Sequence, residues 1–265
     1  MDRIWLNGFL YVAVVRELKN YIISLKNRPD RLKEFMEANK DVRIDIEMFD
    51  AIDGNIISKN TLIQNRIISD QNNYSPAALG CLVSHLTLWK QAVDQNSQIT
   101  IFEDDAVLHK DFQDLSRSLI EEHADFDIIF WGCNTDWPIE LAVGAGFSSV
   151  TLLCGPGEPR FSPMTPLMAH PKLLKVTLLA GLCSYTISPK GAEKLLRLLL
   201  PLGNEDTKIR IFKDGLGNKS ETIPWINTGI DVALSKHLMN INSYISFPFI
   251  SGSKNEWNKS SIQIF

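Results

Sequence analysis

Hydrophobic and polar positions along the first fifty residues follow two different periods, which predict a strand, a helix and a second strand. Residues 20–25 (NYIISL) are rich in β-branched side chains and predict a strand. The sequence NRPDR then turns the chain, and RLKEFMEANK has helical spacing. A second strand is expected at residues 44–49, before the turn sequence AIDGN. A strand–turn–helix opening of this kind is typical of nucleotide-binding α/β domains.

The central part of the chain continues this alternation. In residues 80–93 (GCLVSHLTLWKQAV) the apolar side chains Leu82, Leu86 and Trp89 recur at helical spacing, which predicts an amphipathic helix packed on a sheet. Residues 99–102 (ITIF) and the segment FDIIFW that begins at Phe126 are apolar runs of the length of buried strands. Strands that alternate with helices favour a mostly parallel sheet.

The pattern returns in LCSYTISPKGAEKLLRLLL, where a strand leads into a leucine-rich helix. Ser188 is the expected N-cap and Pro189 the expected first helical residue. The later sequence TGIDVALSKHLM predicts a short helix. The sequence therefore predicts an α/β fold with a doubly wound, mostly parallel sheet flanked by helices, in one domain over residues 1–265.

Three segments give no firm element of this kind. Residues 1–19 form an N-terminal extension, expected to be a docking helix or an edge strand. Residues 144–171 are rich in Gly and Pro, and residues 203–222 are polar with scattered glycines. Long loops within compact domains are usually functional, so we expect the regions 134–180 and 203–226 to lie on the side of a substrate acceptor.

Composition narrows the function classes. The chain has 265 residues, of which 45% are hydrophobic and 22% charged, and a net charge of −4, so it has the profile of a globular protein and no overall affinity for nucleic acid. Its four cysteines are far apart and form no CxxC pair. This spacing argues against a zinc site and fits free thiols in a reducing compartment.

No apolar run reaches the roughly eighteen residues that a membrane span requires. The N-terminal stretch WLNGFLYVAVV is short, and VVRELKN after it supplies no small-residue cleavage site for a signal peptide. The chain is therefore expected to be cytoplasmic. A peripheral contact with the inner face of the membrane is the alternative that this stretch leaves open.

The chemistry that stands out is in IFEDDAVL, where three acids follow a predicted buried strand. Adjacent carboxylates raise one another's pKa and repel, so the arrangement needs a compensating partner. In an extended segment Glu103 and Asp105 point the same way and Asp104 points the opposite way. Such a pair suits Mg²⁺ or Mn²⁺ at the carboxyl end of a strand, where α/β sheets bind ligands. A solvated acidic turn that caps the next helix is the alternative.

Four blocks of sequence carry a resemblance to a known family. YIISLKNRPDRL, GCLVSHLTLWKQAV, ITIFEDDAVL and SYTISPKGAEKLL resemble glycosyltransferase family 25, and they occur in the family's order. The family includes bacterial lipooligosaccharide galactosyltransferases and, more distantly, collagen galactosyltransferase domains. The resemblance implies a GT-A-like fold, a UDP-sugar donor that is usually UDP-galactose, and inversion at the anomeric carbon. It also implies that the acid triplet stands where the family has its metal motif.

The resemblance assigns roles at the triplet and after the first strand. Asp105 is the expected direct metal ligand and Glu103 a further one, while Glu103 and Asp104 hold metal waters or the donor ribose. A metal that bridges carboxylates and the diphosphate stabilises the leaving group. Arg28 and Arg31 follow the first strand, where the family block is also basic, and Arg forks suit phosphate oxygens. Two solvated arginines at the start of a helix are the alternative.

Further donor contacts are expected from the first strand and from the amphipathic helix. Backbone groups of Ser24 and Leu25 are candidates to hold the nucleotide base. The pair Ser84 and His85 matches the family block and is a candidate donor contact. A buried histidine with satisfied hydrogen bonds is the alternative for His85.

An inverting transferase also needs a base that takes the proton from the acceptor hydroxyl. Asp231 opens a helix well downstream of the acids and is the candidate, although Ile230 precedes it where the family has a proline. The alternative is an Asp that favours the helix dipole. Trp137 and Trp225 are candidates for stacking on a sugar, or they are core residues.

These inferences predict a metal-dependent, inverting glycosyltransferase that uses Mn²⁺ or Mg²⁺. It moves a hexose, with galactose the first candidate, from a UDP-sugar to a lipooligosaccharide or another glycan. One alternative is a transferase that acts on protein, as the collagen branch does. Another is a non-catalytic binding protein on a transferase fold. A metal-dependent phosphatase is disfavoured because the chain has no D-x-D-x-T motif.

Overall fold

The fold is built on one large mixed sheet. The computed structural model describes residues 4–6, 9–11, 18–144, 149–154, 161–212 and 220–254. Among these, nine strands form the main sheet, in the order β4 (Glu47–Asp50), β3 (Lys19–Ser24), β5 (Ile99–Glu103), β11 (Ser184–Ile187), β7 (Ile128–Gly132), β14 (Ser243–Phe247), β10 (Lys172–Leu178), β8 (Ile139–Leu141) and β9 (Val150–Leu152). The strands predicted near residues 20, 44, 99 and 126 are confirmed as β3, β4, β5 and β7.

Parallel pairing is confined to two parts of the sheet. Strand β3 pairs in parallel with both β4 and β5, and β14 pairs in parallel with β7. Strand β11 pairs antiparallel with β5 and with β7, and β10 pairs antiparallel with β14 and with β8, as β8 does with β9. The predicted α/β sheet is therefore present, and it is mixed in strand direction rather than mostly parallel.

Six α-helices and two short 3₁₀ helices accompany the sheet in the described ranges. They are α1 (Pro29–Ala38), η1 (Gly54–Ile56), α2 (Lys59–Gln64), α3 (Pro76–Gln95), α4 (Phe112–Glu122), α5 (Pro189–Leu199), α6 (Ile230–Ser235) and η2 (Leu238–Asn240). The predicted cap of α5 is confirmed, because the Ser188 hydroxyl accepts from the amide of Gly191. Helix α4 was not predicted from the hydrophobic pattern.

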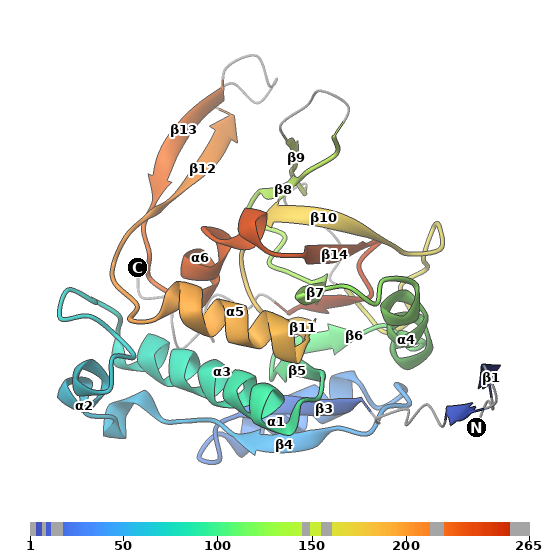
Figure 1. Cartoon of the computed structure of the whole chain (residues 1–265), viewed down its shortest axis with the longest axis horizontal. Coiled ribbons are helices and arrows are strands. Elements are labelled where there is room, and N and C mark those ends of the chain that lie inside the picture. Colours follow the sequence, from blue (N-terminus) through green and yellow to red (C-terminus); the bar gives the residue numbers. More distant parts are fainter. Residues whose placement is uncertain are drawn as a thin grey trace.

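The helices cover both faces of the sheet. Successive side chains of a strand point to opposite faces, so an apolar strand needs a packing partner on each side. Ile128 and Phe130 of β7 face one apolar core, and Ile129 and Trp131 face a second. The first core also takes the apolar faces of α3, α5 and α6, and the second takes those of α1 and α4. In Figure 1 α3 and α5 run alongside each other over the sheet. Strands buried on both faces read as continuous apolar runs, as observed here.

Three small two-stranded sheets complete the described fold. They are β1 (Ile4–Leu6) with β2 (Phe9–Tyr11), β6 (Ala106–Leu108) with β15 (Ser251–Ser253), and β12 (Thr207–Phe212) with β13 (Ser220–Trp225). Figure 1 shows the hairpin β12–β13 standing out from the body of the molecule. The N-terminal extension was expected to be a docking helix or an edge strand, and its two strands pair with each other instead of with the main sheet.

Segments predicted to be loops contain several of these strands. Strands β8, β9 and β10 lie within 134–180, and the β12–β13 hairpin lies within 203–226. The sequence of β10, KLLKVTL, suits a helix as well as a strand, and its pairing with β14 and β8 decides the outcome. None of the described helices is long and apolar enough to cross a membrane.

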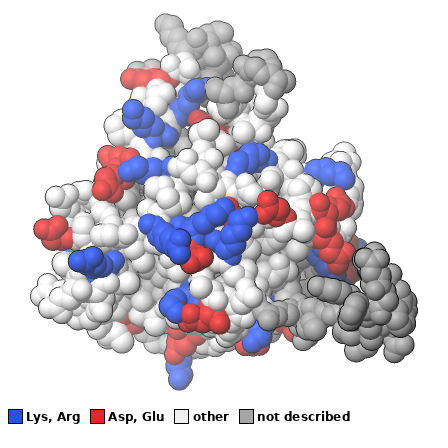
Figure 2. Space-filling model, viewed as in Figure 1, with Lys and Arg blue, Asp and Glu red and all other residues white. Residues whose placement is uncertain are grey.

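The surface over α5 carries much of the positive charge on one face. Figure 2 shows Lys and Arg side chains gathered near the centre of that face, interspersed with acids. Within α5, Lys190 pairs with Asp125 at 2.6 Å and Lys194 pairs with the fully buried Asp127 at 2.6 Å. These ion pairs offset the positive charge of the lysines, so the surface over α5 carries both signs of charge.

Candidate functional site

The acid triplet lies at the carboxyl end of a central strand, as predicted. Glu103 is the last residue of β5, and Asp104 and Asp105 form the turn into β6. The adjacent parallel strand β3 ends at Ser24, so two parallel strands end at the same edge of the sheet. Ligands of α/β sheets bind at such edges. Because residues 104 and 105 form a turn, each acid takes its own partner instead of following strand alternation.

Asp104 is held by the segment that follows β3. Nε of Arg31 on α1 donates to Oδ1 of Asp104 at 2.7 Å, and the Ser24 hydroxyl donates to Oδ2 at 3.1 Å. Both members of the ion pair are largely buried, with side-chain exposures of 21% for Arg31 and 11% for Asp104. Burial makes such a pair costly to break. Arg31 and Ser24, both predicted donor contacts, therefore lie beside the triplet and orient its middle carboxylate.

Arg28 and Leu25 lie in the turn between β3 and α1. The backbone carbonyl of Leu25 accepts from the amide of Arg28 at 2.8 Å. The Arg28 guanidinium forms a fork on Asp30, with donor–acceptor distances of 2.8–3.2 Å. Both side chains of this pair are exposed, and such a pair contributes little to stability. Arg28 can therefore leave Asp30 for a ligand at small cost, whereas Arg31 is committed to Asp104.

Asp105 is the acid with the most perturbed ionisation. Its Oδ2 accepts from the Ser253 hydroxyl of β15 at 2.8 Å. Its Oδ1 is shielded from solvent and has no hydrogen-bond partner in the described part of the chain. Burial, with the nearby Glu103 carboxylate as a second cause, raises the pKa of Asp105 to about 6. An orphaned, shielded carboxylate oxygen is the kind of atom that a divalent cation would satisfy, so this residue fits the implied metal.

Glu103 terminates a chain of hydrogen bonds that starts in the core. The Trp89 indole donates to the Tyr185 hydroxyl at 2.8 Å, the hydroxyl lies 2.7 Å from Nδ1 of His85, and Nε2 of His85 lies 3.3 Å from Oε1 of Glu103. The Tyr185 oxygen accepts from Trp89 and keeps a second lone pair, so its hydroxyl can either donate to Nδ1 of His85 or accept from it. When it donates, the histidine proton is on Nε2 and faces Glu103. His85 is therefore a buried histidine whose two ring nitrogens both have hydrogen-bond partners, as the alternative expected. One of those partners is the site acid Glu103.

Ser84, the neighbour of His85, has a structural position. It is fully buried, and its hydroxyl accepts from the amide of Ile52 at 2.8 Å and donates to the carbonyl of Gly80 at 2.8 Å. A Cβ at Gly80 would lie 2.4 Å from the Ile52 carbonyl oxygen, so only glycine permits this approach. Ser84 thus fixes α3 against the segment after β4. Its contact with a donor stays a prediction.

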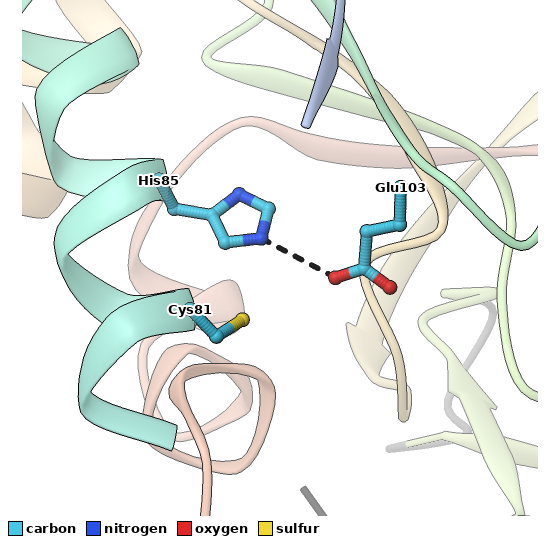
Figure 3. A group of neighbouring side chains, drawn as sticks. All are labelled: Cys81, His85 and Glu103. Atoms are coloured by element: carbon cyan, nitrogen blue, oxygen red, sulfur yellow. Dashed lines mark hydrogen bonds and ion pairs between the residues drawn. The ribbon is translucent and has the colours of Figure 1, made fainter. Parts of the chain in front are cut away.

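Cys81 lies one helical turn before His85 and faces the same space. Burial, together with the carboxylates of Glu103 and Asp231, raises the pKa of the Cys81 thiol well above its ordinary value. Ligand atoms of Cys81, His85 and Glu103 lie within 4.8 Å of one another. Figure 3 shows the three side chains, two from α3 and one from the end of β5, converging on one space. Sequence reasoning looked for paired cysteines and missed this cysteine–histidine spacing.

Asp231, the predicted base, lies at the start of α6 near the other acids. Its Oδ2 accepts from the amide of Gly181 at 2.8 Å. The same segment reaches the triplet, because the Cys183 carbonyl accepts from the amide of Glu103 at 2.9 Å. Burial raises the pKa of Asp231, the backbone amides around it oppose this, and Glu103 raises it further. The structure therefore brings the predicted base to the acid end of β5.

The two tryptophans named from sequence stack on each other. Trp137 and Trp225 have ring centroids 5.1 Å apart and an interplanar angle of 22°. Trp225 is buried in a small core with Leu178 and Val232, which ties the base of the β12–β13 hairpin to the body of the fold. Trp225 is thus a core residue, and stacking of Trp137 on a sugar stays a prediction.

Comparison with known proteins gives one family and several relatives. A sequence model of the family described as glycosyltransferase family 25 (LPS biosynthesis protein) matches residues 17–207. A Haemophilus influenzae protein named "Putative glycosyltransferase" is 28% identical over 219 residues, 80% of this chain and 69% of that protein. A Bos taurus protein named "Probable inactive glycosyltransferase 25 family member 3" is 30% identical over 139 residues, 48% of this chain and 23% of that protein.

A third relative is the Mus musculus procollagen galactosyltransferase 2, 25% identical over 188 residues, 66% of this chain and 27% of that protein. The chain thus matches about a quarter of the length of the two mammalian relatives and about two thirds of the bacterial one. All three matches are to proteins with transferase names, and one of those names includes the word inactive.

The ionisation of Asp105 gives a pH-dependent prediction for chelator-treated protein. A carboxyl whose pKa rises on folding stabilises the fold below its unfolded pKa of about 4, and this stability is lost as pH rises through about 6. Asp105→Asn should therefore match the wild type near pH 4 and exceed its unfolding free energy at pH 8 by on the order of 1–3 kcal/mol. Urea unfolding at the two pH values measures the difference.

The exposed Asp114 of α4 supplies the matched control, because Asp114→Asn makes the same substitution at a solvent-exposed position. An Asp105→Asn variant that is equally destabilised at both pH values would show that this carboxylate is not strained by burial.

Proposed function

Because the chain belongs to glycosyltransferase family 25, we propose that it is a metal-dependent, inverting hexosyltransferase that uses a UDP-sugar donor. Galactose is the first candidate for the sugar, and a lipooligosaccharide or another glycan is the proposed acceptor. The observation that carries the proposal is the acid end of β5, where Asp105 keeps a shielded oxygen with no hydrogen-bond partner among the described residues, and where Asp231 lies nearby. The family description names LPS biosynthesis, and a mouse relative is named a procollagen galactosyltransferase.

The donor is proposed to lie across the carboxyl ends of β3 and β5. Asp105 and Glu103 would hold Mn²⁺ or Mg²⁺, which supplies Lewis-acid stabilisation of charge on the leaving diphosphate. Arg28, weakly tied to Asp30, is positioned to reach a phosphate, and Arg31 keeps Asp104 in place for the donor ribose. Backbone groups of the turn after Ser24 would contact the nucleotide base.

The acceptor is proposed to be activated by Asp231. A general base works best when its pKa lies near the operating pH, and burial moves the pKa of Asp231 upward toward that range. The Gly181 amide donates to Oδ2 of this carboxylate and so fixes its orientation at the start of α6. The proton of the hydroxyl passes to Asp231 as the sugar bond forms on the face opposite the diphosphate. Segments 134–180 and 203–226 would supply acceptor contacts.

Metal dependence is tested with a panel of nucleotide sugars, each incubated with and without Mn²⁺. Turnover of one UDP-hexose is expected, measured as UDP release, and EDTA should abolish it. Asp105→Ala should also abolish it while the circular dichroism spectrum persists, and Asp114→Ala on the exposed surface of α4 should leave it unchanged. Full turnover in EDTA would exclude the metal. Absence of both turnover and UDP binding would favour the non-catalytic alternative, to which the relative named inactive points.

The base is tested with Asp231→Asn, which keeps an oxygen that accepts from the Gly181 amide. Loss of the base should lower kcat by about 10²-fold or more while UDP affinity measured by calorimetry stays the same. The melting temperature of the same variant separates the two roles of this residue. A lower melting temperature with unchanged kcat would mean that Asp231 only stabilises the start of α6.

A further inference from the structure

Cys81, His85 and Glu103 form a ligand set that the proposed transfer reaction does not use as a unit. Cys81 and His85 are four residues apart on α3 and so lie on the same face of the helix. Glu103 reaches the same space from the end of β5, and its Oε1 faces His85 while its second oxygen points away (Figure 3). One sulfur, one nitrogen and one oxygen thus converge from two rigid elements.

The spacing of these atoms fits a tetrahedral ion. A Zn²⁺ ion with bonds of about 2.0 Å to nitrogen and oxygen places those two atoms roughly 3.3 Å apart. Nε2 of His85 and Oε1 of Glu103 are 3.3 Å apart, and the three ligand atoms all lie within 4.8 Å of one another. Only small side-chain movements are needed for all three to reach one ion.

His85 is also supported in the way that metal-bound histidines are. Its Nδ1 lies 2.7 Å from the Tyr185 hydroxyl, which the Trp89 indole holds in place. A hydroxyl both donates and accepts, so Tyr185 donates to Nδ1 when Nε2 carries the proton and accepts from Nδ1–H when Nε2 binds a cation. Such outer contacts orient the ring and raise metal affinity.

We propose that Cys81, His85 and Glu103 bind one Zn²⁺ ion, with the fourth position open to water or a ligand. Thiolate and imidazole ligands select Zn²⁺ over Mg²⁺ and Mn²⁺, whereas the oxygen ligands around Asp105 suit the harder cations. The side chain of Glu103 is 30% exposed, so an ion can reach the site from the Glu103 side. Binding replaces the thiol proton of Cys81, which is released to solvent.

The site shares Glu103 with the proposed donor site but does not depend on transferase activity. Glu103 has two oxygens, and the one that faces His85 is the one assigned to Zn²⁺. An ion there would fix the Glu103 side chain at the edge of the space assigned to the diphosphate. Zinc occupancy and donor binding are therefore expected to influence each other.

The test is a Co²⁺ titration of the full chain, stripped of metal and kept reduced by a phosphine. Co²⁺ replaces Zn²⁺ in tetrahedral sites and reports a bound thiolate as a charge-transfer band in the near ultraviolet. One equivalent should produce the band, and Zn²⁺ should abolish it by displacement. Cys81→Ser should lose the band, whereas Cys154→Ser, also at a half-buried cysteine, should keep it. Tyr185→Phe removes only the outer contact to His85, so it should keep the band and lower the affinity for Co²⁺ by about 10-fold.

Absence of the band in the wild type, its survival in Cys81→Ser or its loss in Cys154→Ser would each overturn the assignment. Glu103→Gln, which retains the shape of the side chain, provides a second variant if Cys81→Ser unfolds, and it should weaken Co²⁺ binding by at least about 10-fold. Because no sugar nucleotide is present, these outcomes leave the transferase proposal unaffected.

Discussion

Three adjacent carboxylates at the end of a buried strand repel one another, and the contacts of residues 103–105 reflect that repulsion. Arg31 neutralises the charge of Asp104, and the Ser24 hydroxyl donates a hydrogen bond to its other oxygen. His85, held by Tyr185, faces Glu103. Among the described residues the Asp105 carboxylate accepts only from the Ser253 hydroxyl, on one oxygen, and its pKa is raised to about 6. The repulsion is thus relieved at two acids and left at the third, which is where a cation would be most strongly stabilising.

The periodicity of the chain was enough to predict the strands around this site but not the contacts between them. Strand β5 ends at Glu103 as expected, and Ser188 caps α5 as expected. Tyr185 could not be placed beside His85, because its position depends on the antiparallel pairing of β11 with β5. The same limit hid Ser253, which reaches Asp105 from near the end of the described chain. Those contacts are tertiary, and no local pattern encodes them.

The residues at the acid end of β5, which include the unpredicted Cys81, form two groups that differ in their contacts. Arg31, Asp104 and Ser24 form a buried network that fixes the edge of the sheet, so their first contribution is to position the acids. Asp105, Asp231 and Cys81 keep groups with perturbed pKa values at that same edge. Perturbed groups gather at functional sites because catalysis and metal binding both require them. Membership of glycosyltransferase family 25 gives this gathering a chemical context.

The location of the metal and nucleotide tests the central claim most directly. Crystals grown with Mn²⁺ and UDP should show one anomalous manganese peak beside the shielded oxygen of Asp105, with the UDP diphosphate on its other side and the nucleoside over the end of β3. A nucleotide bound elsewhere on the chain, or a manganese peak away from residues 103–105, would contradict the account.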